Sequence, residues 1–383
     1  SNNFDYVGKI IKKIDDNPQT KLGILQITPN GPRVKSIDKS GKEWLVELDK
    51  GVVIEDGELV EFKKIDSGRR IRSEKVRVSE RLGDPSAPKS VSLIAIHQHK
   101  IPNIFPEDVL IQSKKASFLQ NKKWDDYSHL PFVTIDPKDA RDHDDACYAK
   151  PDDDPKNIGG HLIWVAIADV AHFVRSGDAI DNEARHRGNS TYFPDRVVPM
   201  LPDNLSGNLC SLHEGEKRAC IVVKIKIDSV GNKISHKFTR AVIQSWASLE
   251  YGEVQKVIDK GKGKPKVLDL VNTVIKPLYD AYSCLKISRK VRSPLDLNLP
   301  ERKIEIDEKG IVKDVRFKER LEAHKLIEEF MILANVCAAE TLSYKKTPTI
   351  FRVHEEPNKE KIEALRKTAL SVGLKLSKGQ NIK

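Results

Sequence analysis

Five aspartates fall within ten residues, in a segment where an apolar run leads directly into acidic residues. The segment runs from Thr134 to Ala146 and has aspartates at 136, 139, 142, 144 and 145. Because like charges packed this closely repel each other, the group needs a compensating cation. Carboxylate oxygens are the hard ligands that Mg²⁺ and Mn²⁺ prefer. A metal held there could orient a water molecule, lower its pKa and stabilise charge on a phosphate, which is the chemistry of phosphodiester hydrolysis.

Two other structures could explain the same run of aspartates, an exposed acidic loop and a calcium-binding loop. A calcium loop that began at Asp142 would need a glycine at its sixth position, where this chain has Cys147. Apolar residues flank the run at 132–135 and 146–149 and place it at the edge of a hydrophobic core. These features favour a metal site, and the exposed loop remains the main alternative.

The segment before the aspartates has the pattern of a small β-barrel. Short β-type runs at 7–11, 22–27, 44–48 and 59–62 are separated by turns that contain glycine. A barrel of the OB type binds single-stranded nucleic acid through a basic groove and stacked aromatic rings, and the arginine-rich piece at 69–72 suits the basic part of this role. A barrel that serves only as a scaffold remains an alternative.

A mixed α+β domain is expected after the barrel. Prolines between 84 and 106 indicate a junction. Beyond it the pattern predicts strands and then, after residue 250, helices that include a long one near 319–341. The predicted strands lie at 132–135, 162–168, 219–227 and 237–243, with a Gly-Asn turn at 231–232. We therefore predict an OB-type barrel at 1–83, a junction at 84–125 and an α+β domain at 126–383.

The composition is that of a folded protein with a basic surface. The 383 residues include 66 lysines and arginines against 56 aspartates and glutamates, a net charge of +10, which suits a polyanionic partner without establishing one. The five cysteines form no Cys-x-x-Cys pair, so reduced and buried thiols are expected. No apolar run approaches the roughly 18 residues of a membrane span, and residues 1–3 have no signal-peptide core. We expect a monomeric, cytoplasmic protein that does not enter membranes.

The sequence resembles the ribonuclease II/RNase R family. The aspartate segment is similar to the signature of the family's catalytic RNB domain. Further similar motifs follow in the family's order at 167–170, 191–194 with 199–202, 209–212, 324–335 and 351–355. The preceding barrel resembles the second cold-shock domain of RNase R, so the resemblance covers nearly the whole chain and favours an RNase R-type protein over an RNase II-type one.

The resemblance implies a 3′-to-5′ exoribonuclease that uses Mg²⁺, or Mn²⁺, to hydrolyse single-stranded RNA to nucleoside 5′-monophosphates. By similarity, Asp136, Asp142 and Asp145 would bind the metal, directly or through water. Asp144 would be catalytic together with Asp142, and the loss of Asp144 would damage catalysis most. His143 lies inside the cluster, but the family does not require histidine there, so we expect at most a supporting role.

Two substrate contacts also follow from the resemblance. Tyr192 would stack on the 3′-terminal base, although a tyrosine buried in a loop-rich core is the alternative. Glu328 or Glu329 would approach the terminal ribose, and we assign this role to Glu329. The alternative is that both are solvated acidic residues on the polar face of a helix.

The sequence departs from the family near its end. By resemblance, two further features are expected: an S1 RNA-binding barrel and a Ser-Pro-Ile-Arg-Arg motif, whose arginine neutralises the scissile phosphate. In this sequence Ser293-Pro294 is followed by Leu295-Asp296, so this Ser-Pro pair does not form the motif. We therefore expect a catalytic domain that is incomplete at its C-terminus and hydrolyses RNA very poorly by itself. The alternatives are an RNA-binding fragment with impaired catalysis, a non-catalytic relative and a metal-dependent endonuclease.

Overall fold

The computed structural model describes most of the chain, in two compact units. The first unit comprises 1–106, 183–200 and 301–317, and the second comprises 107–182, 201–300 and 318–383. The described residues are 21–38, 40–47, 54–65, 75–118, 123–292, 294, 299–307, 311–353 and 355–377. The predicted strand at 7–11, the arginines at 69–72, Ser293 and the residues from 295 to 298 lie outside them.

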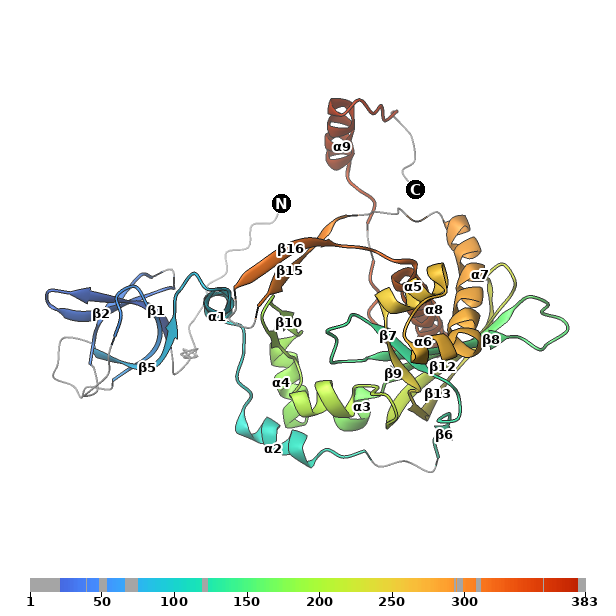
Figure 1. Cartoon of the computed structure of the whole chain (residues 1–383), viewed down its shortest axis with the longest axis horizontal. Coiled ribbons are helices and arrows are strands. Elements are labelled where there is room, and N and C mark those ends of the chain that lie inside the picture. The colour runs from blue at the N-terminus through green and yellow to red at the C-terminus, as the bar shows by residue number, and fades with distance from the viewer. Residues whose placement is uncertain are drawn as a thin grey trace, which may run out of the picture. The chain divides into compact units, whose positions relative to one another are not determined.

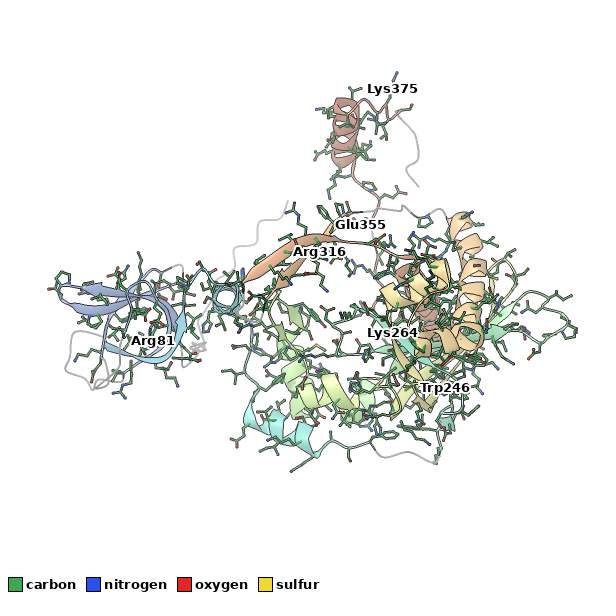
Figure 2. All side chains as sticks on the ribbon, in the orientation of Figure 1. Arg81, Trp246, Lys264, Arg316, Glu355 and Lys375 are labelled. Atoms are coloured by element: carbon green, nitrogen blue, oxygen red, sulfur yellow. The ribbon has the colours of Figure 1, made fainter. Side chains whose placement is uncertain are left out.

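A closed five-stranded barrel forms the N-terminal part of the first unit (Figure 1). Its strands follow the order β1-β2-β3-β5-β4 and are β1 (Lys21–Thr28), β2 (Gly31–Ser36), β3 (Glu43–Val46), β4 (Leu59–Lys64) and β5 (Lys75–Gly83). Alternate side chains such as Leu25, Val34 and Phe62 fill its interior. Arg81, labelled in Figure 2, joins β5 to the buried Glu58 by an ion pair of 2.7 Å. The prediction of a small barrel is confirmed, and its OB-type assignment and RNA-binding role stay predictions.

Beyond the barrel, the described residues of the first unit form one complete helix and two hairpins. They are α1 (Pro88–Gln98), the hairpin of β10 (Thr191–Tyr192) with β11 (Val197–Val198), and the hairpin of β15 (Glu301–Ile306) with β16 (Val312–Lys318). Helix α4 (Ala179–Arg187) runs into this unit at residue 183. Pro88 begins α1, where a missing N–H costs no intrahelical hydrogen bond.

A seven-stranded mixed sheet forms the centre of the second unit. Its order is β14-β7-β8-β9-β12-β13-β6, with parallel pairs only at its two edges, β14 with β7 and β13 with β6. The strands are β6 (Asp125–Asp126), β7 (Val133–Asp136), β8 (Asp145–Pro151), β9 (His161–Ala168), β12 (Lys217–Ile227), β13 (Lys233–Gln244) and β14 (Ala247–Glu250). The predicted strands all occur within a few residues of their expected bounds, whereas β8 was not predicted.

Helices cover one face of this sheet (Figure 1). They are α5 (Tyr251–Lys260), α6 (Pro265–Asp269), the π-helical turn η2 (Val271–Ile275), α7 (Lys276–Arg292) and α8 (Glu322–Tyr344), the long helix that the sequence predicts. The β12–β13 turn packs so closely on α7 that a Cβ at Gly231 would lie 2.3 Å from the carbonyl oxygen of Cys284. With φ at +81°, only glycine fits this position comfortably.

The remaining elements of the second unit are short or peripheral. They are α2 (Glu107–Lys115), α3 (Val170–Phe173), the π-helical turn η1 (Leu205–Leu209) and α9 (Lys359–Ser371). All five cysteines are buried free thiols, as predicted. In the part of the chain that the structure describes, no helix has the length and apolar character needed to cross a membrane.

Candidate active site at the aspartate loop

The aspartate loop connects two neighbouring strands of the sheet. Strand β7 is buried up to its last residue, Asp136, where the chain leaves the core, and β8 begins at Asp145. Residues 137–144 therefore form a loop that starts and ends beside a carboxylate. The apolar residues of β7 anchor the start of the loop in the core, and the aspartate side chains that follow reach the surface.

A buried serine from a distant part of the chain fixes the loop. The hydroxyl of Ser211 accepts from the backbone N–H of His143 at 3.0 Å and donates to the carbonyl of Arg141 at 3.1 Å. The N–H of Leu212 donates to the backbone carbonyl of His143 at 2.9 Å, and the N–H of Ala168 donates to the backbone carbonyl of Asp144 at 3.0 Å. These bonds fix the backbone from which the aspartate side chains project. Ser211 lies in the motif at 209–212, but this contact was not predicted from the sequence.

His143 is bound to the first aspartate of the cluster. Its Nδ1 lies 2.7 Å from Oδ2 of Asp136, and both side chains are largely buried. This hydrogen bond, helped by the negative charges of Asp136, Asp142 and Asp145, raises the pKa of His143 despite the opposing effect of burial. His143 therefore orients Asp136 and adds positive charge to the cluster when protonated, while its supporting role in catalysis stays a prediction.

The other carboxylates lie close enough to repel each other. Burial, followed by the charges of Asp136 and Asp144, raises the pKa of Asp145 to about 7. Asp144 is exposed, but the protein atoms around it and the charges of Asp142 and Asp136 raise its pKa as well. The cluster thus holds more negative charge than His143 can balance.

This charge excess and the oxygen donors suit a divalent cation. Among the described residues, however, no three His, Cys, Asp or Glu side chains are placed so that they could hold one metal ion together. The predicted metal ligands Asp136, Asp142 and Asp145 are therefore brought into electrostatic contact but not into a formed coordination site.

A tyrosine that the sequence did not single out borders the cluster. Tyr251 begins α5 directly after β14, and its ring stacks on His324 with centroids 4.0 Å apart. Burial and the charges of Asp136 and Asp145 raise the pKa of Tyr251, so its hydroxyl stays protonated at neutral pH. His324 accepts from the backbone N–H of Leu321 through Nδ1 at 3.1 Å, which leaves the proton of the neutral ring on Nε2.

The two candidate glutamates of α8 differ in their surroundings. Glu329 is 3% exposed, and its carboxylate is paired with Arg289 at 2.6 Å and Arg292 at 2.7 Å on α7. Glu328 is partly exposed, pairs with Arg320 at 2.5 Å and contributes to the raised pKa of Tyr251. The ribose contact assigned to Glu329 stays a prediction, but the geometry favours Glu328 because Glu329 already binds two arginines.

Two further residues from the sequence motifs have clear positions. Tyr192 belongs to β10 in the first unit, is 66% exposed and pairs with Val197, so it is not the buried tyrosine of the alternative. Its stacking on an RNA base stays a prediction. Asp169 follows β9 and is buried, where its Oδ2 lies 3.0 Å from Nε of Arg240.

The comparisons with known proteins agree with this architecture. Residues 124–383 match the RNB domain family. Ribonuclease R of Vibrio cholerae is 36% identical over 329 residues, which cover 84% of this chain and 39% of that protein, so the chain spans about two fifths of this curated relative.

Similarity to solved structures extends over both units. RNase R of Mycoplasma genitalium in complex with double-stranded RNA has a TM-score of 0.80 at 27% identity, covering 98% of this chain and 66% of that chain. Yeast Ssd1, a pseudonuclease, has a TM-score of 0.56 at 16% identity over 97% of this chain and 46% of its own, a likeness of fold alone. Since the RNB match takes in well over half of the residues, this chain belongs to the RNB-domain family.

Proposed function

We propose that this chain forms the catalytic core of a 3′-to-5′ exoribonuclease that hydrolyses single-stranded RNA to nucleoside 5′-monophosphates. The observation that carries the proposal is the group of carboxylates at one loop, where burial and then the charges of Asp136 and Asp144 raise the pKa of Asp145 to about 7. A protein has little reason to keep such a costly charge cluster unless a ligand neutralises it. The named Ribonuclease R relative supports the choice of RNA as substrate.

A divalent cation, Mg²⁺ or Mn²⁺, would be held by Asp136, Asp142 and Asp145. When bound, it would supply water activation and neutralise charge on the scissile phosphate. The chain's own contribution is positioning: His143 orients Asp136 through the 2.7 Å hydrogen bond, and Ser211 fixes the loop backbone. Asp144 remains on the exposed side of the loop, where it can meet the substrate.

Substrate recognition would combine stacking with polar contacts. The exposed ring of Tyr192 offers a surface that accepts any base, because stacking needs no particular hydrogen-bonding pattern. Glu328 would contact the terminal ribose, or Glu329 would do so after it releases Arg289 and Arg292. The barrel and the positive net charge of the chain would attract the phosphate backbone.

A second candidate function is RNA binding without hydrolysis. The fold alone permits it, since the fold likeness includes the pseudonuclease Ssd1. The aspartates at 136, 142, 144 and 145 favour hydrolysis, because an RNA-binding surface is weakened by clustered negative charge.

The proposal is tested with the full-length protein and a 5′-labelled single-stranded RNA, with and without Mg²⁺ or Mn²⁺. We expect shortening from the 3′ end and release of nucleoside 5′-monophosphates, identified by chromatography. A circular RNA of the same sequence should stay intact. Cleavage of the circle would indicate an endonuclease, and binding without any cleavage would support the non-catalytic alternative.

A further inference from the structure

The hairpin that carries Tyr192 is too short to hold its own shape. Its strands β10 and β11 contribute two residues each, paired as Thr191 with Val198 and Tyr192 with Val197. An isolated two-stranded hairpin is marginally stable at best in water. Val198 is buried, whereas Tyr192 and Val197 are exposed, as the alternation of side chains along a strand requires. The direction of the Tyr192 ring therefore depends on the contacts of the hairpin with other segments of the first unit.

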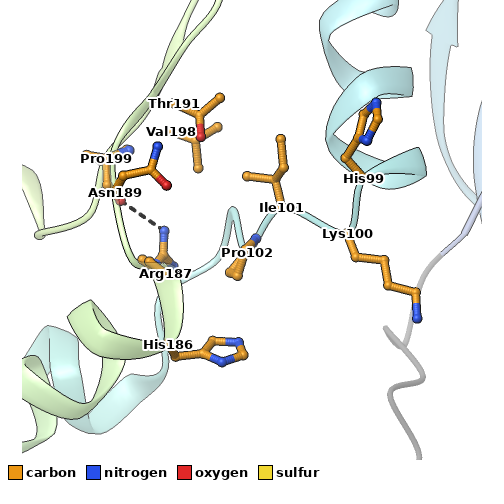
Figure 3. A pocket seen from close by; sticks show the side chains of 10 residues that line it. All are labelled: His99, Lys100, Ile101, Pro102, His186, Arg187, Asn189, Thr191, Val198 and Pro199. Atoms are coloured by element: carbon orange, nitrogen blue, oxygen red, sulfur yellow. Dashed lines mark hydrogen bonds between the residues drawn. The ribbon is translucent and has the colours of Figure 1, made fainter. Parts of the chain in front are cut away.

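One buried arginine ties the two ends of the hairpin together. Nη1 of Arg187, which precedes the hairpin, donates to the carbonyl of Pro199, which follows it, at 3.1 Å, the bond drawn in Figure 3. Nη2 donates to the carbonyl of Ile104 at 2.9 Å, and Nε donates to Glu183 at 2.8 Å. The guanidinium carbon lies 3.6 Å from the ring centroid of Phe105. With its side chain 2% exposed, Arg187 fixes the base of the hairpin against Ile104 and Phe105.

The turn between β10 and β11 is docked on α1. Asp195 lies in this turn, and its side chain is only 4% exposed. Its carboxylate accepts from the hydroxyl of Ser92 on α1 and from Nε of Arg196 at 2.8 Å. Nη2 of Arg196 in turn donates to the carbonyl of Lys89, also on α1, at 3.3 Å. Both charged residues of the turn are therefore attached to the same helix.

The carboxylate of Asp195 is buried and still ionised. Burial by itself raises the pKa of Asp195, but the hydrogen bonds from Ser92 and Arg196 outweigh it, so that the pKa lies below its ordinary value. Hydrogen bonds to an ionised acceptor are roughly twice as strong as those between neutral groups and are also shorter. A buried charge is costly unless its partners stay in place. Asp195 therefore restrains the turn to the position in which both partners reach it.

We propose that Asp195 is a positioning residue, which acts through Tyr192 by holding the hairpin in the conformation that stacks on an RNA base. Tyr192 lies between two anchors, Arg187 at the base of the hairpin and Asp195 in its turn. With both ends fixed, the ring is oriented before RNA arrives, so less conformational entropy is lost on binding. The inference rests on the stacking role that the proposed function gives to Tyr192.

The test is a double-mutant cycle on RNA binding. The full-length protein in EDTA, which prevents metal-dependent cleavage, is titrated into a short fluorescein-labelled oligo(A), and the Kd is measured by fluorescence anisotropy. Tyr192→Ala should raise the Kd about tenfold, the usual size of a base–aromatic stack. Asp195→Asn, which keeps the shape of the side chain, should raise it at least about threefold. In the Tyr192→Ala background Asp195→Asn should have no further effect, because a residue that acts through Tyr192 has nothing left to position.

Two neighbours on α1 supply a second variant and its control. Ser92→Ala removes one partner of Asp195 and should raise the Kd in the same way as Asp195→Asn. Val91→Ala changes the exposed residue next to Ser92 and should leave the Kd unchanged. Hydrogen–deuterium exchange follows the hairpin itself: Asp195→Asn should speed the exchange of the amides at 191–198 and leave those of β12 unchanged.

The possible failures give different patterns. If Asp195→Asn raised the Kd equally with and without Tyr192, its effect would be general and the positioning role would be overturned. A wild-type Kd for Asp195→Asn, with weak binding by Tyr192→Ala, would overturn the positioning role alone. A wild-type Kd for Tyr192→Ala would overturn the stacking contact of the proposed function and this inference with it. Because the assay uses no cleavage, loss of the exonuclease assignment alone would leave the cycle interpretable.

Discussion

Asp145 shows how a single residue can limit the stability of the metal-free protein. In an unfolded chain an aspartate ionises near pH 4, whereas burial and the charges of Asp136 and Asp144 place the pKa of folded Asp145 at about 7. Between these values the folded state holds a proton that the unfolded state has lost, so stability falls as the pH rises from about 4 to about 7. The thermodynamic linkage between protonation and folding limits this loss in the free energy of unfolding to roughly 4 kcal/mol.

The first prediction is that Asp145→Asn stabilises the metal-free protein at high pH. In EDTA at pH 8 the variant should melt about 5 °C above the wild type, and the difference should disappear near pH 4. Thermal unfolding followed by circular dichroism across this pH range makes the measurement. The control is Asp269→Asn on an exposed helix end, which should change nothing. Equal melting curves for Asp145→Asn and the wild type at pH 8 would contradict a raised pKa.

The second prediction concerns the cation itself. Mg²⁺ or Mn²⁺ should raise the melting temperature of the wild type at pH 8, because an ion that binds only the folded state at 100 times its Kd adds about 2.7 kcal/mol. Asp142→Asn should lose most of this effect, and Asp269→Asn should keep it. Stabilisation by Ca²⁺ alone would instead favour a calcium loop.

The third prediction separates binding from chemistry. Asp144→Asn keeps the shape of the side chain and removes its charge, so the full-length protein should still bind single-stranded RNA, since phosphate contacts provide most of the affinity. Hydrolysis should fall by orders of magnitude. Filter binding and single-turnover cleavage measure the two effects. Turnover within a few-fold of the wild type would remove Asp144 from the catalytic group.

The acidic residues of the site could be predicted from the sequence because they are adjacent in it. The interactions of Ser211, although it lies in the motif at 209–212, and of Tyr251 could not, since each reaches the aspartate loop only through the fold, across about 70 and 110 residues of chain. Their residue types carry no signal by themselves: a buried serine or tyrosine is common in any core. The role of Glu329 was also beyond sequence, because its partners Arg289 and Arg292 lie on a different helix.

At the scale of elements, the ion pairs of Glu329 join α7 to α8. Both helices pack on the sheet that carries the aspartate loop, so their spacing affects the core beneath it. Removal of this carboxylate takes away the buried partner that Arg289 and Arg292 share.

The fourth prediction compares the two neighbouring glutamates. Glu329→Gln should lower the free energy of unfolding by about 2 to 4 kcal/mol, whereas Glu328→Gln, at a partly exposed position, should change it by less than about 1 kcal/mol. Urea denaturation gives both values. In the cleavage assay Glu328→Gln should lower the rate of RNA hydrolysis without lowering the free energy of unfolding. If Glu329→Gln were the stable but inactive variant, the ribose contact would belong to Glu329.

The sequence predicted elements with a strong local pattern and missed those without one. The short runs of apolar and β-branched residues in β9, β12 and β13 identify them as strands. Strand β8 was hidden because its first residue belongs to the aspartate run, so acidic residues mask the start of its apolar pattern. The hairpin of β15 and β16 is exposed along most of its length and has no buried face from which a strand could be read.

At the scale of the whole molecule, the sequence indicated a barrel followed by an α+β domain, and the structure contains both. The division into compact units could not be read from it, since residues 183–200 and 301–317 group with the first unit although they are distant in sequence. The local sequence of such segments does not indicate where they pack, because their packing partners are distant in the sequence and come together only in the folded chain. The predicted limits at 83 and 125 stay predictions.

The parallel pairing of β7 with β14 also affects the order in which the protein can fold during synthesis. Strand β7 and its Asp136 leave the ribosome early, but the neighbouring strand β14, whose Glu250 lies opposite Asp136, follows roughly a hundred residues later. At ordinary rates of translation this delay is on the order of 5 to 20 s. During that time β7 has only β8 beside it, joined by the pair of Val133 with Cys147. The pairing of β7 with β14 therefore forms late. For several seconds the nascent chain exposes the aspartates before this part of the sheet is complete.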